Sequence, residues 1–255
     1  MRNLWIIYRK EMRSYFVSPV AYLLLTMFAV VCGLFFSSAV ISFVNAAMEM
    51  QFRGQSFPMN LNEEVVRPLL STFAVIALFF IPMISMRLFA EEKRSGTIEL
   101  LATSPIRDIE VILGKWLAAM TLYTLMLLLT VLDFCFLFIY GNPDWKPMAL
   151  GYLGLLLLGG ALLAIGTLIS TMTKNQIVAG GATFGVCLVL WIIHWVGEYD
   201  ASFWSRVFQY LSVTVHLDSF SKGVLDMKDL VFYVTLIFLG SFLTARSMES
   251  LRWRS

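Results

Sequence analysis

Residues 148–171 read MALGYLGLLLLGGALLAIGTLIST, a run of 24 residues that contains no charged side chain. As an α-helix, such a run extends about 36 Å, which exceeds the roughly 30 Å of hydrocarbon in a bilayer. A soluble core rarely needs an uninterrupted apolar segment of this length. The stretch therefore predicts a helix that spans a membrane.

Five other blocks have the same character, although the last has only 16 residues and is short for a bilayer. They cover residues 19–44, 68–88, 116–140, 177–196 and 230–245. The whole chain is 59% hydrophobic and 14% charged, whereas soluble domains carry about 25% charged residues. We therefore predict an all-α integral membrane protein, with six transmembrane helices in one domain over residues 1–255.

The positions of the basic residues predict the orientation of the spans. Lys and Arg collect in cytoplasmic loops. With both termini in the cytoplasm, 13 of the 19 Lys and Arg residues fall on the inner side. This bias also supports the short sixth span, because without it three C-terminal arginines would lie outside. The net charge of +2 is too small to indicate a nucleic-acid partner.

Residues 1–18 precede the first span and predict a separate amphipathic helix. Apolar side chains recur at helical spacing, namely Leu4, Tyr8, Met12 and Tyr15. Basic side chains take another face, namely Arg2, Arg9 and Arg13. This pattern favours a helix in the inner interface, with its apolar side in the acyl region and its basic side toward lipid phosphates. An ordinary positive flank before the first span is the alternative.

Two further patterns concern helix packing and the outer side. The pattern Gly181-x-x-x-Gly185 favours close helix–helix approach, and packing within one subunit is the simpler interpretation. A partner chain is the alternative. The outer segment 197–229 mixes aromatic and charged residues, which is typical of chain that lies along a membrane interface.

The cytoplasmic connection 89–115 between the second and third spans is the most organised loop. Residues 87–107 read RLFAEEKRSGTIELLATSPIR. Gly96 can end the extension of the second span, and residues 97–103 are long enough for two helical turns. Ser104 and Pro105 then fit the N-cap and first position of the next helix. The expected result is an elbow that carries a short exposed helix, suited to docking on a partner.

The same connection carries a resemblance to a known family. The run EEKRSGTIELL at 91–101, followed by SPI at 104–106, resembles the loop after the second helix of ABC-2-type transporter permeases. The run RKEMRSYFVSP at 9–19 and the run FSKGVLD at 220–226 are also similar to that family. The likeness covers essentially the whole chain. Within the family, the sequence most resembles the permease subunit of gliding-motility-type ABC transporters.

This resemblance implies a transport function in a bacterial inner membrane. Such permeases pair into a twelve-helix dimer, with the same chain or a related one, and bind two cytoplasmic ATPase subunits. An accessory protein on the outer side is a further possible partner. The elbow would then act as a coupling helix at the ATPase interface. Its expected contact residues are Glu91, Glu92, Arg94, Gly96, Thr97, Leu100, Leu101 and Pro105. The alternative is that the charged ones form a solvated helix end.

The chain has no Gly-x-x-x-x-Gly-Lys-Ser/Thr run, the phosphate-binding loop of many ATPases. We therefore expect no cofactor, metal site or enzymatic activity in this chain, and we expect the partner ATPase to bind ATP and Mg²⁺. The competing hypothesis is a membrane anchor that recruits soluble proteins through the same loop and transports nothing.

Three polar residues in or near the spans need separate interpretation. Asp133 falls about 10 Å deep in the third span, where an acid is costly and is a functional candidate. A structural hydrogen bond or contact with the outer interface is the alternative. His194 and His216 lack partners at metal-ligand spacing, so we expect packing or interfacial roles for both.

Overall fold

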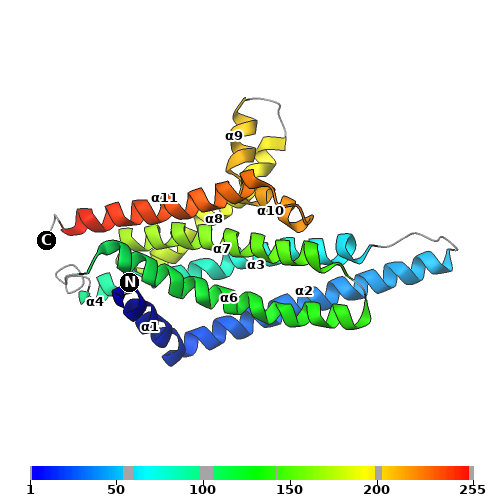
Figure 1. Cartoon of the computed structure of the whole chain (residues 1–255), viewed down its shortest axis with the longest axis horizontal. Helices are drawn as coiled ribbons and strands as arrows, with labels where there is room; N and C mark the ends of the chain where they lie inside the picture. The colour runs from blue at the N-terminus through cyan, green and yellow to red at the C-terminus, as the bar shows by residue number, and fades with distance from the viewer. Residues whose placement is uncertain (1, 54–59, 98–105, 142, 199–202, 253–255) are drawn as a thin grey trace.

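The structure is a computed structural model that describes residues 2–53, 60–97, 106–141, 143–198 and 203–252. These residues form a bundle of long helices that run in a similar direction, with no strand among them (Figure 1). Six helices are long and apolar enough to cross a membrane. They include α2 (Pro19–Phe52), α3 (Arg67–Ser85), α6 (Asp108–Tyr140), α7 (Trp145–Met172), α8 (Gln176–Glu198) and α11 (Met227–Arg252). The predicted all-α architecture with six spans is confirmed.

Several helices are longer than the apolar blocks that predicted them. α2 continues to Phe52, eight residues beyond the predicted end at position 44. α11 has 26 residues, about 39 Å of helix, so the sixth span is not short for a bilayer. α11 contains charged residues at both ends, and a search for apolar blocks leaves such residues out. A short π-helical turn, η1 (Asn62–Val66), leads into α3.

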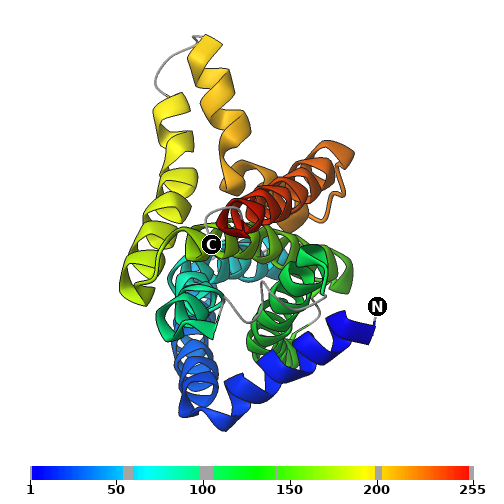
Figure 2. The same cartoon turned by 90° about the vertical axis from the view of Figure 1, so that its left-hand side faces the viewer.

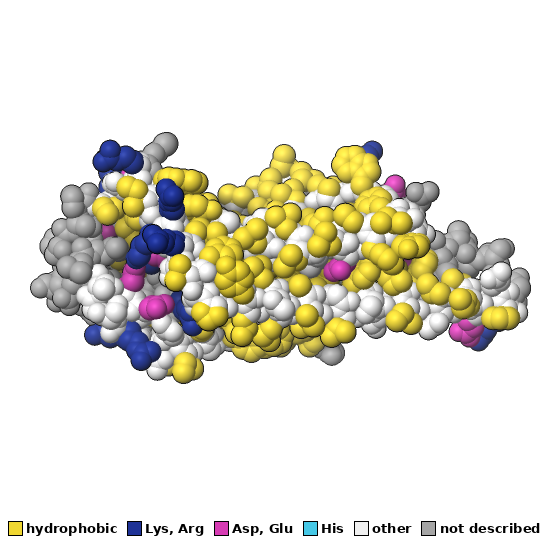
Figure 3. Space-filling view, turned by 90° about the horizontal axis from the view of Figure 1, so that it is seen from below, with side chains coloured by type: hydrophobic (Ala, Val, Ile, Leu, Met, Phe, Trp, Pro, Cys, Tyr) yellow, Lys and Arg dark blue, Asp and Glu magenta, His cyan; other side chains and the backbone are white. Residues whose placement is uncertain are grey.

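Basic side chains gather at the end of the bundle that holds α1 (Arg2–Val17) and α4 (Ala90–Ser95) (Figure 3). Apolar side chains cover the length between the two ends on this face. This separation of charge is the pattern that the positive-inside rule describes. Figure 2 views the molecule from the basic end and shows α1 lying across it.

α7 forms the centre of the bundle and packs against α3, α6, α8 and α11. Its glycines allow the close approach. A Cβ atom added at Gly159 would overlap the ring of Tyr123, which is fully buried and donates a hydrogen bond to the Leu155 carbonyl at 3.0 Å. Tight packing within one subunit therefore accounts for this part of the glycine pattern.

The glycines of α8 behave differently from those of α7. A Cβ atom added at Gly181 or Gly185 would meet no atom within 4 Å among the described residues. The simpler interpretation of Gly181-x-x-x-Gly185, packing within the subunit, is therefore wrong for these two positions. α8 leans away from the bundle with α9 (Phe203–Leu211) beside it (Figure 2).

α1 is present as predicted, but part of its predicted apolar side packs on α6. Ile7 is buried, and the Tyr8 hydroxyl lies 3.1 Å from Thr121 Oγ1 on α6. Gly114 of α6 permits this contact, because a Cβ atom there would lie 3.0 Å from Ile7 Cγ2. The stripe that contains Leu4 and Tyr8 thus packs on protein, because α6 offers an apolar surface that the sequence pattern does not reveal.

The described part of the segment 197–229 contains two short helices before α11. α9 packs against α8, and α10 (Val213–Ser221) packs against α7. His216 of α10 is buried, with Nδ1 at 2.6 Å from Asp229 Oδ1 and Nε2 at 2.9 Å from the Tyr210 carbonyl. Phe232 stacks on its ring with centroids 3.8 Å apart. His216 therefore has the packing role that we expected, together with an acidic partner that we did not foresee.

Candidate functional site

The elbow begins where α3 ends at Ser85 and the backbone makes a turn over residues 86–89 before α4. Gly96 follows α4 in the left-handed conformation with φ of 75°, which glycine adopts at little cost. The prediction that Gly96 ends this helix is confirmed. α4 is short and charged, and it lies at the basic end of the molecule (Figure 1).

Ser170, near the end of α7, fixes the start of α4. Phe89 precedes α4 and provides no capping side chain. Instead, the buried Ser170 Oγ accepts hydrogen bonds from the backbone N–H groups of Phe89 and Ala90, at 3.0 and 3.1 Å. Its hydroxyl also lies 3.3 Å from the Met86 carbonyl, to which it donates. Lys93 donates to the Thr171 carbonyl, so both turns of α4 are attached to α7.

Four charged side chains connect α4 with α1 and α6. Lys115 of α6 is 2% exposed, and its Nζ lies 2.9 Å from Glu11 Oε1 and 3.0 Å from Glu92 Oε1. Lys10 Nζ lies 3.0 Å from the same Glu92 oxygen and 3.4 Å from Glu11. The formal charges cancel, as a cluster with buried members requires. We call Lys10, Glu11, Glu92 and Lys115 the charge cluster.

The pKa of Lys10 depends on its burial and on the two neighbouring carboxylates of the charge cluster. Burial alone would lower the pKa of Lys10, but the carboxylates of Glu92 and Glu11 outweigh it and hold this pKa above its ordinary value. The Lys115 ammonium also lies 5.2 Å from the centre of the Phe89 ring, a distance that allows a cation–π interaction. Lys10 therefore stays charged at neutral pH and contributes to the binding of Glu92.

A small cavity of about 120 Å³ lies beside the charge cluster. Its lining comes from α1, the start of α2 and the elbow, and includes Glu11, Tyr15, Arg87 and Glu91. Burial raises the pKa of the Tyr15 hydroxyl, so it stays protonated. Arg87 Nε is buried, with no hydrogen-bond partner among the described residues. A polar space of this size is large enough for a few water molecules.

The predicted elbow residues take two different orientations. Glu91, Arg94, Gly96 and Thr97 are exposed. Glu92, in contrast, points inward and belongs to the charge cluster. The remaining predicted contacts, together with most of the short helix predicted over 97–103, fall outside the described residues; the contacts are Leu100, Leu101 and Pro105.

The predicted start of the third spanning helix at Ser104 and Pro105 is wrong. α6 begins at Asp108, after Arg107, whose φ and ψ of −73° and 135° are extended. Ile106 and Arg107 are not helical. Ser104 and Pro105 themselves fall outside the described residues.

Asp133 lies on α6, one turn from Thr130, and is half-buried. It lies near Cys32 of α2 and Tyr152 of α7. The Tyr152 hydroxyl lies 2.7 Å from Thr130 Oγ1. Asp133 makes no ion pair within the described part of the chain. Together with Thr130 and Tyr152, it forms a small polar group on α6 and α7.

Sequence reasoning did not foresee that Lys115, Glu11 and Ser170 hold the elbow in place. Lys115 carries one signal, because it lies between Gly114 and Trp116 where the apolar run of α6 begins. A lysine at that depth must find an acidic partner or reach water. Ser170 carries no such signal, since its role depends on the position of α3 relative to α7.

The fold and the elbow define a class of helical membrane protein in which a charged loop is fastened to the spanning helices. Residues 5–239 match the family described as ABC-2 family transporter protein. The chain belongs to this family, whose members are membrane components of transporters. A comparison with curated proteins finds no match.

Proposed function

We propose that this chain is the permease subunit of an ATP-driven transporter and that its elbow receives the movement of a cytoplasmic ATPase. One observation supports the proposal most strongly. The elbow presents Glu91, Arg94 and Thr97 to solvent, while Glu92 and Ser170 fasten it to two spanning helices. A loop with one free face and one fixed face is suited to transmit force.

The contacts of the elbow define two routes into the membrane. The Glu92–Lys115 ion pair leads to α6, and the hydrogen bonds of Ser170 and Lys93 lead to α7. α7 packs against α3 and α11, so displacement of α4 would be passed to most of the bundle. In this proposal, the partner ATPase binds ATP and Mg²⁺. The chain lies in a bacterial inner membrane, and its basic end faces the cytoplasm.

A second permease subunit, identical or related, completes the transporter in this proposal. The most apolar stretch of α8 is only 17% buried, whereas that of α7 is 67% buried. Gly181 and Gly185 leave room for another helix to approach the open face of α8. Asp133 is the candidate for substrate contact, because an acid in a span is costly unless it has a use or a partner.

Affinity purification of the tagged chain from its native membrane tests the proposal. We expect an ATPase subunit to co-purify, and we expect its ATP turnover to rise in the presence of this chain. If soluble proteins co-purify but none hydrolyses ATP, the chain is the membrane anchor of the competing hypothesis. If the Asp133→Ala variant assembles normally and still transports, Asp133 does not contact the substrate.

A further inference from the structure

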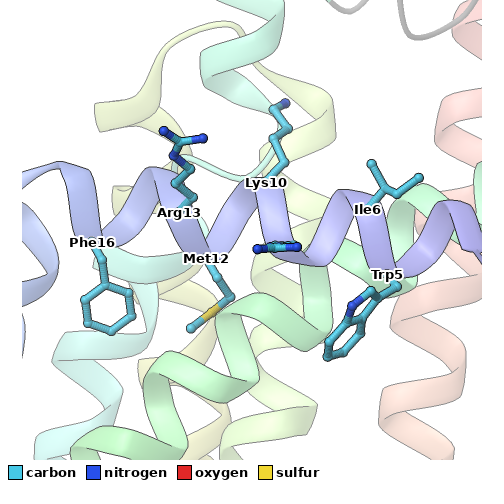
Figure 4. A pocket seen from close by; sticks show the side chains of 7 residues that line it. Trp5, Ile6, Lys10, Met12, Arg13 and Phe16 are labelled. Atoms are coloured by element: carbon cyan, nitrogen blue, oxygen red, sulfur yellow. The ribbon is translucent and has the colours of Figure 1, made fainter.

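The outward face of α1 carries a groove of about 820 Å³. This face is opposite to Ile7, which packs on α6. Figure 4 shows the groove along α1, with apolar and basic side chains on its two sides. Its lining residues are Trp5, Ile6, Arg9, Lys10, Met12, Arg13 and Phe16.

Two arginines provide positive charge that the described protein does not neutralise. Arg9 and Arg13 are four residues apart and both exposed, which places them side by side on the helix. Within the described ranges, neither makes an ion pair or a side-chain hydrogen bond, whereas their neighbour Lys10 pairs with Glu92. Guanidinium groups bind phosphate oxygens through paired hydrogen bonds.

The other side of the groove is apolar and aromatic. Trp5, Met12 and Phe16 point to the same side of α1, away from Lys10 and Arg13 (Figure 4). Trp5 is 62% exposed, although an exposed tryptophan loses the benefit of burial. α1 joins the first span directly through Ser18, so this face lies at the height of the lipid headgroups. Aromatic side chains favour that depth.

We propose that the groove on α1 binds one anionic phospholipid. Arg9 and Arg13 hold its phosphate, and an acyl chain lies along Trp5, Met12 and Phe16. The charge complementarity selects an acidic headgroup, and the adjoining apolar side selects a lipid over an acidic protein segment. This inference does not need the ATPase, because the site lies entirely within the chain.

The lipid site and the elbow use neighbouring faces of one helix, and Lys10 lies between them, because it lines the groove and also pairs with Glu92. Lys10 and Glu11 of α1 belong to the charge cluster that holds Glu92. A lipid bound to Arg9 and Arg13 therefore fixes the helix that also fixes the elbow. The composition of the inner leaflet would thereby influence how firmly α4 is held.

Native mass spectrometry of the full-length chain in detergent tests the site directly. Phosphatidylglycerol and phosphatidylcholine with identical acyl chains are titrated separately, and the bound fractions are compared. We expect a preference for phosphatidylglycerol of about thirtyfold, from two basic residues near an anionic headgroup. The double variant Arg9→Gln/Arg13→Gln should bind both lipids equally. Arg9→Lys/Arg13→Lys keeps the charge and should retain most of the preference.

The matched control is Arg53→Gln/Arg206→Gln. It removes two exposed arginines, one at the end of α2 and one on α9, and should keep the wild-type preference. A Trp5→Ala/Phe16→Ala variant should weaken the binding of both lipids to the same extent. The proposal is overturned if the wild type shows no preference, or if the preference survives in Arg9→Gln/Arg13→Gln. It is also overturned if inorganic phosphate displaces the lipid at equal concentration, or if the arginine variant instead dissociates a dimer.

Discussion

Lys115 lies between the carboxylates of Glu11 and Glu92, and it is 2% exposed. A lysine in such a place loses its hydration, and the two carboxylates stabilise its ammonium group instead. The two acids in turn depend on Lys115, because they are only 13% and 12% exposed. The elbow is thus connected to α6 through an interaction that needs all three of these side chains.

Replacing Lys115 by Met should lower the free energy of unfolding by about 3–5 kcal/mol, since it leaves two poorly solvated carboxylates side by side. Thermal unfolding of the purified chain in detergent measures the change. Lys174→Met is the matched control, because Lys174 is exposed and should have almost no effect. Adding Glu92→Gln to Lys115→Met should recover part of the loss. Equal stability of the two lysine variants would contradict the account of the charge cluster.

Replacing Ser170 by Ala should loosen the elbow more than it destabilises the whole bundle. It removes the acceptor of two backbone N–H groups, and each buried group left without a partner costs about 1–3 kcal/mol. Hydrogen exchange should therefore accelerate at residues 89–95 and stay unchanged in the middle of α7. Ser37→Ala serves as the control, because the exposed Ser37 hydroxyl donates to the Leu34 carbonyl of its own helix. Unchanged exchange at 89–95 would mean that other contacts hold α4.

At the scale of elements, the junction of α10 and α11 depends on His216 and Asp229. The Tyr210 carbonyl can only accept, so His216 Nε2 carries a proton. The second bond then joins Nδ1 to the Asp229 carboxyl group, with one proton between the two atoms. An amide at position 229 can donate to a neutral ring at Nδ1, but a methyl group cannot replace that bond.

Asp229→Asn should therefore be tolerated much better than Asp229→Ala. The alanine variant removes the partner of a buried ring and should cost about 3–5 kcal/mol, whereas the asparagine variant should cost about 1 kcal/mol or less. Limited proteolysis within residues 213–229 reports the loosening of α10. If both variants are cleaved equally fast, the pair does not hold the junction.

The glycines of α7 and α8 lead to a second prediction about the packing of individual helices. Gly159→Ala should destabilise the chain by about 1–3 kcal/mol, since its methyl group would overlap the buried Tyr123 ring. Gly181→Ala should leave the monomer unaffected or slightly more stable, because that Cβ would meet open space. Thermal unfolding of the two variants under identical detergent conditions compares them directly. A larger loss for Gly181→Ala would place another helix on α8.

The whole molecule shows which features a sequence can predict. Six spans, the N-terminal helix and the end of α4 at Gly96 depend on local patterns, and the structure confirms them. The packed face of α1 and the roles of Lys115 and Ser170 depend on segments distant in sequence that fold together. Glu92 illustrates the difference, because its position in the elbow was predictable and its inward orientation was not.

The elbow is proposed to couple ATP hydrolysis by a partner subunit to movement of this chain. ATP turnover by the complex purified through the tagged chain measures this most directly, with wild type compared to Arg94→Glu and Arg206→Glu. Both arginines are exposed, but Arg94 lies on α4 and Arg206 on α9. We expect Arg94→Glu to reduce co-purified turnover by about tenfold, equivalent to 1.4 kcal/mol of binding, and Arg206→Glu to leave it unchanged. Absence of ATP turnover with the wild-type chain, or equal turnover in all three, would contradict the claim.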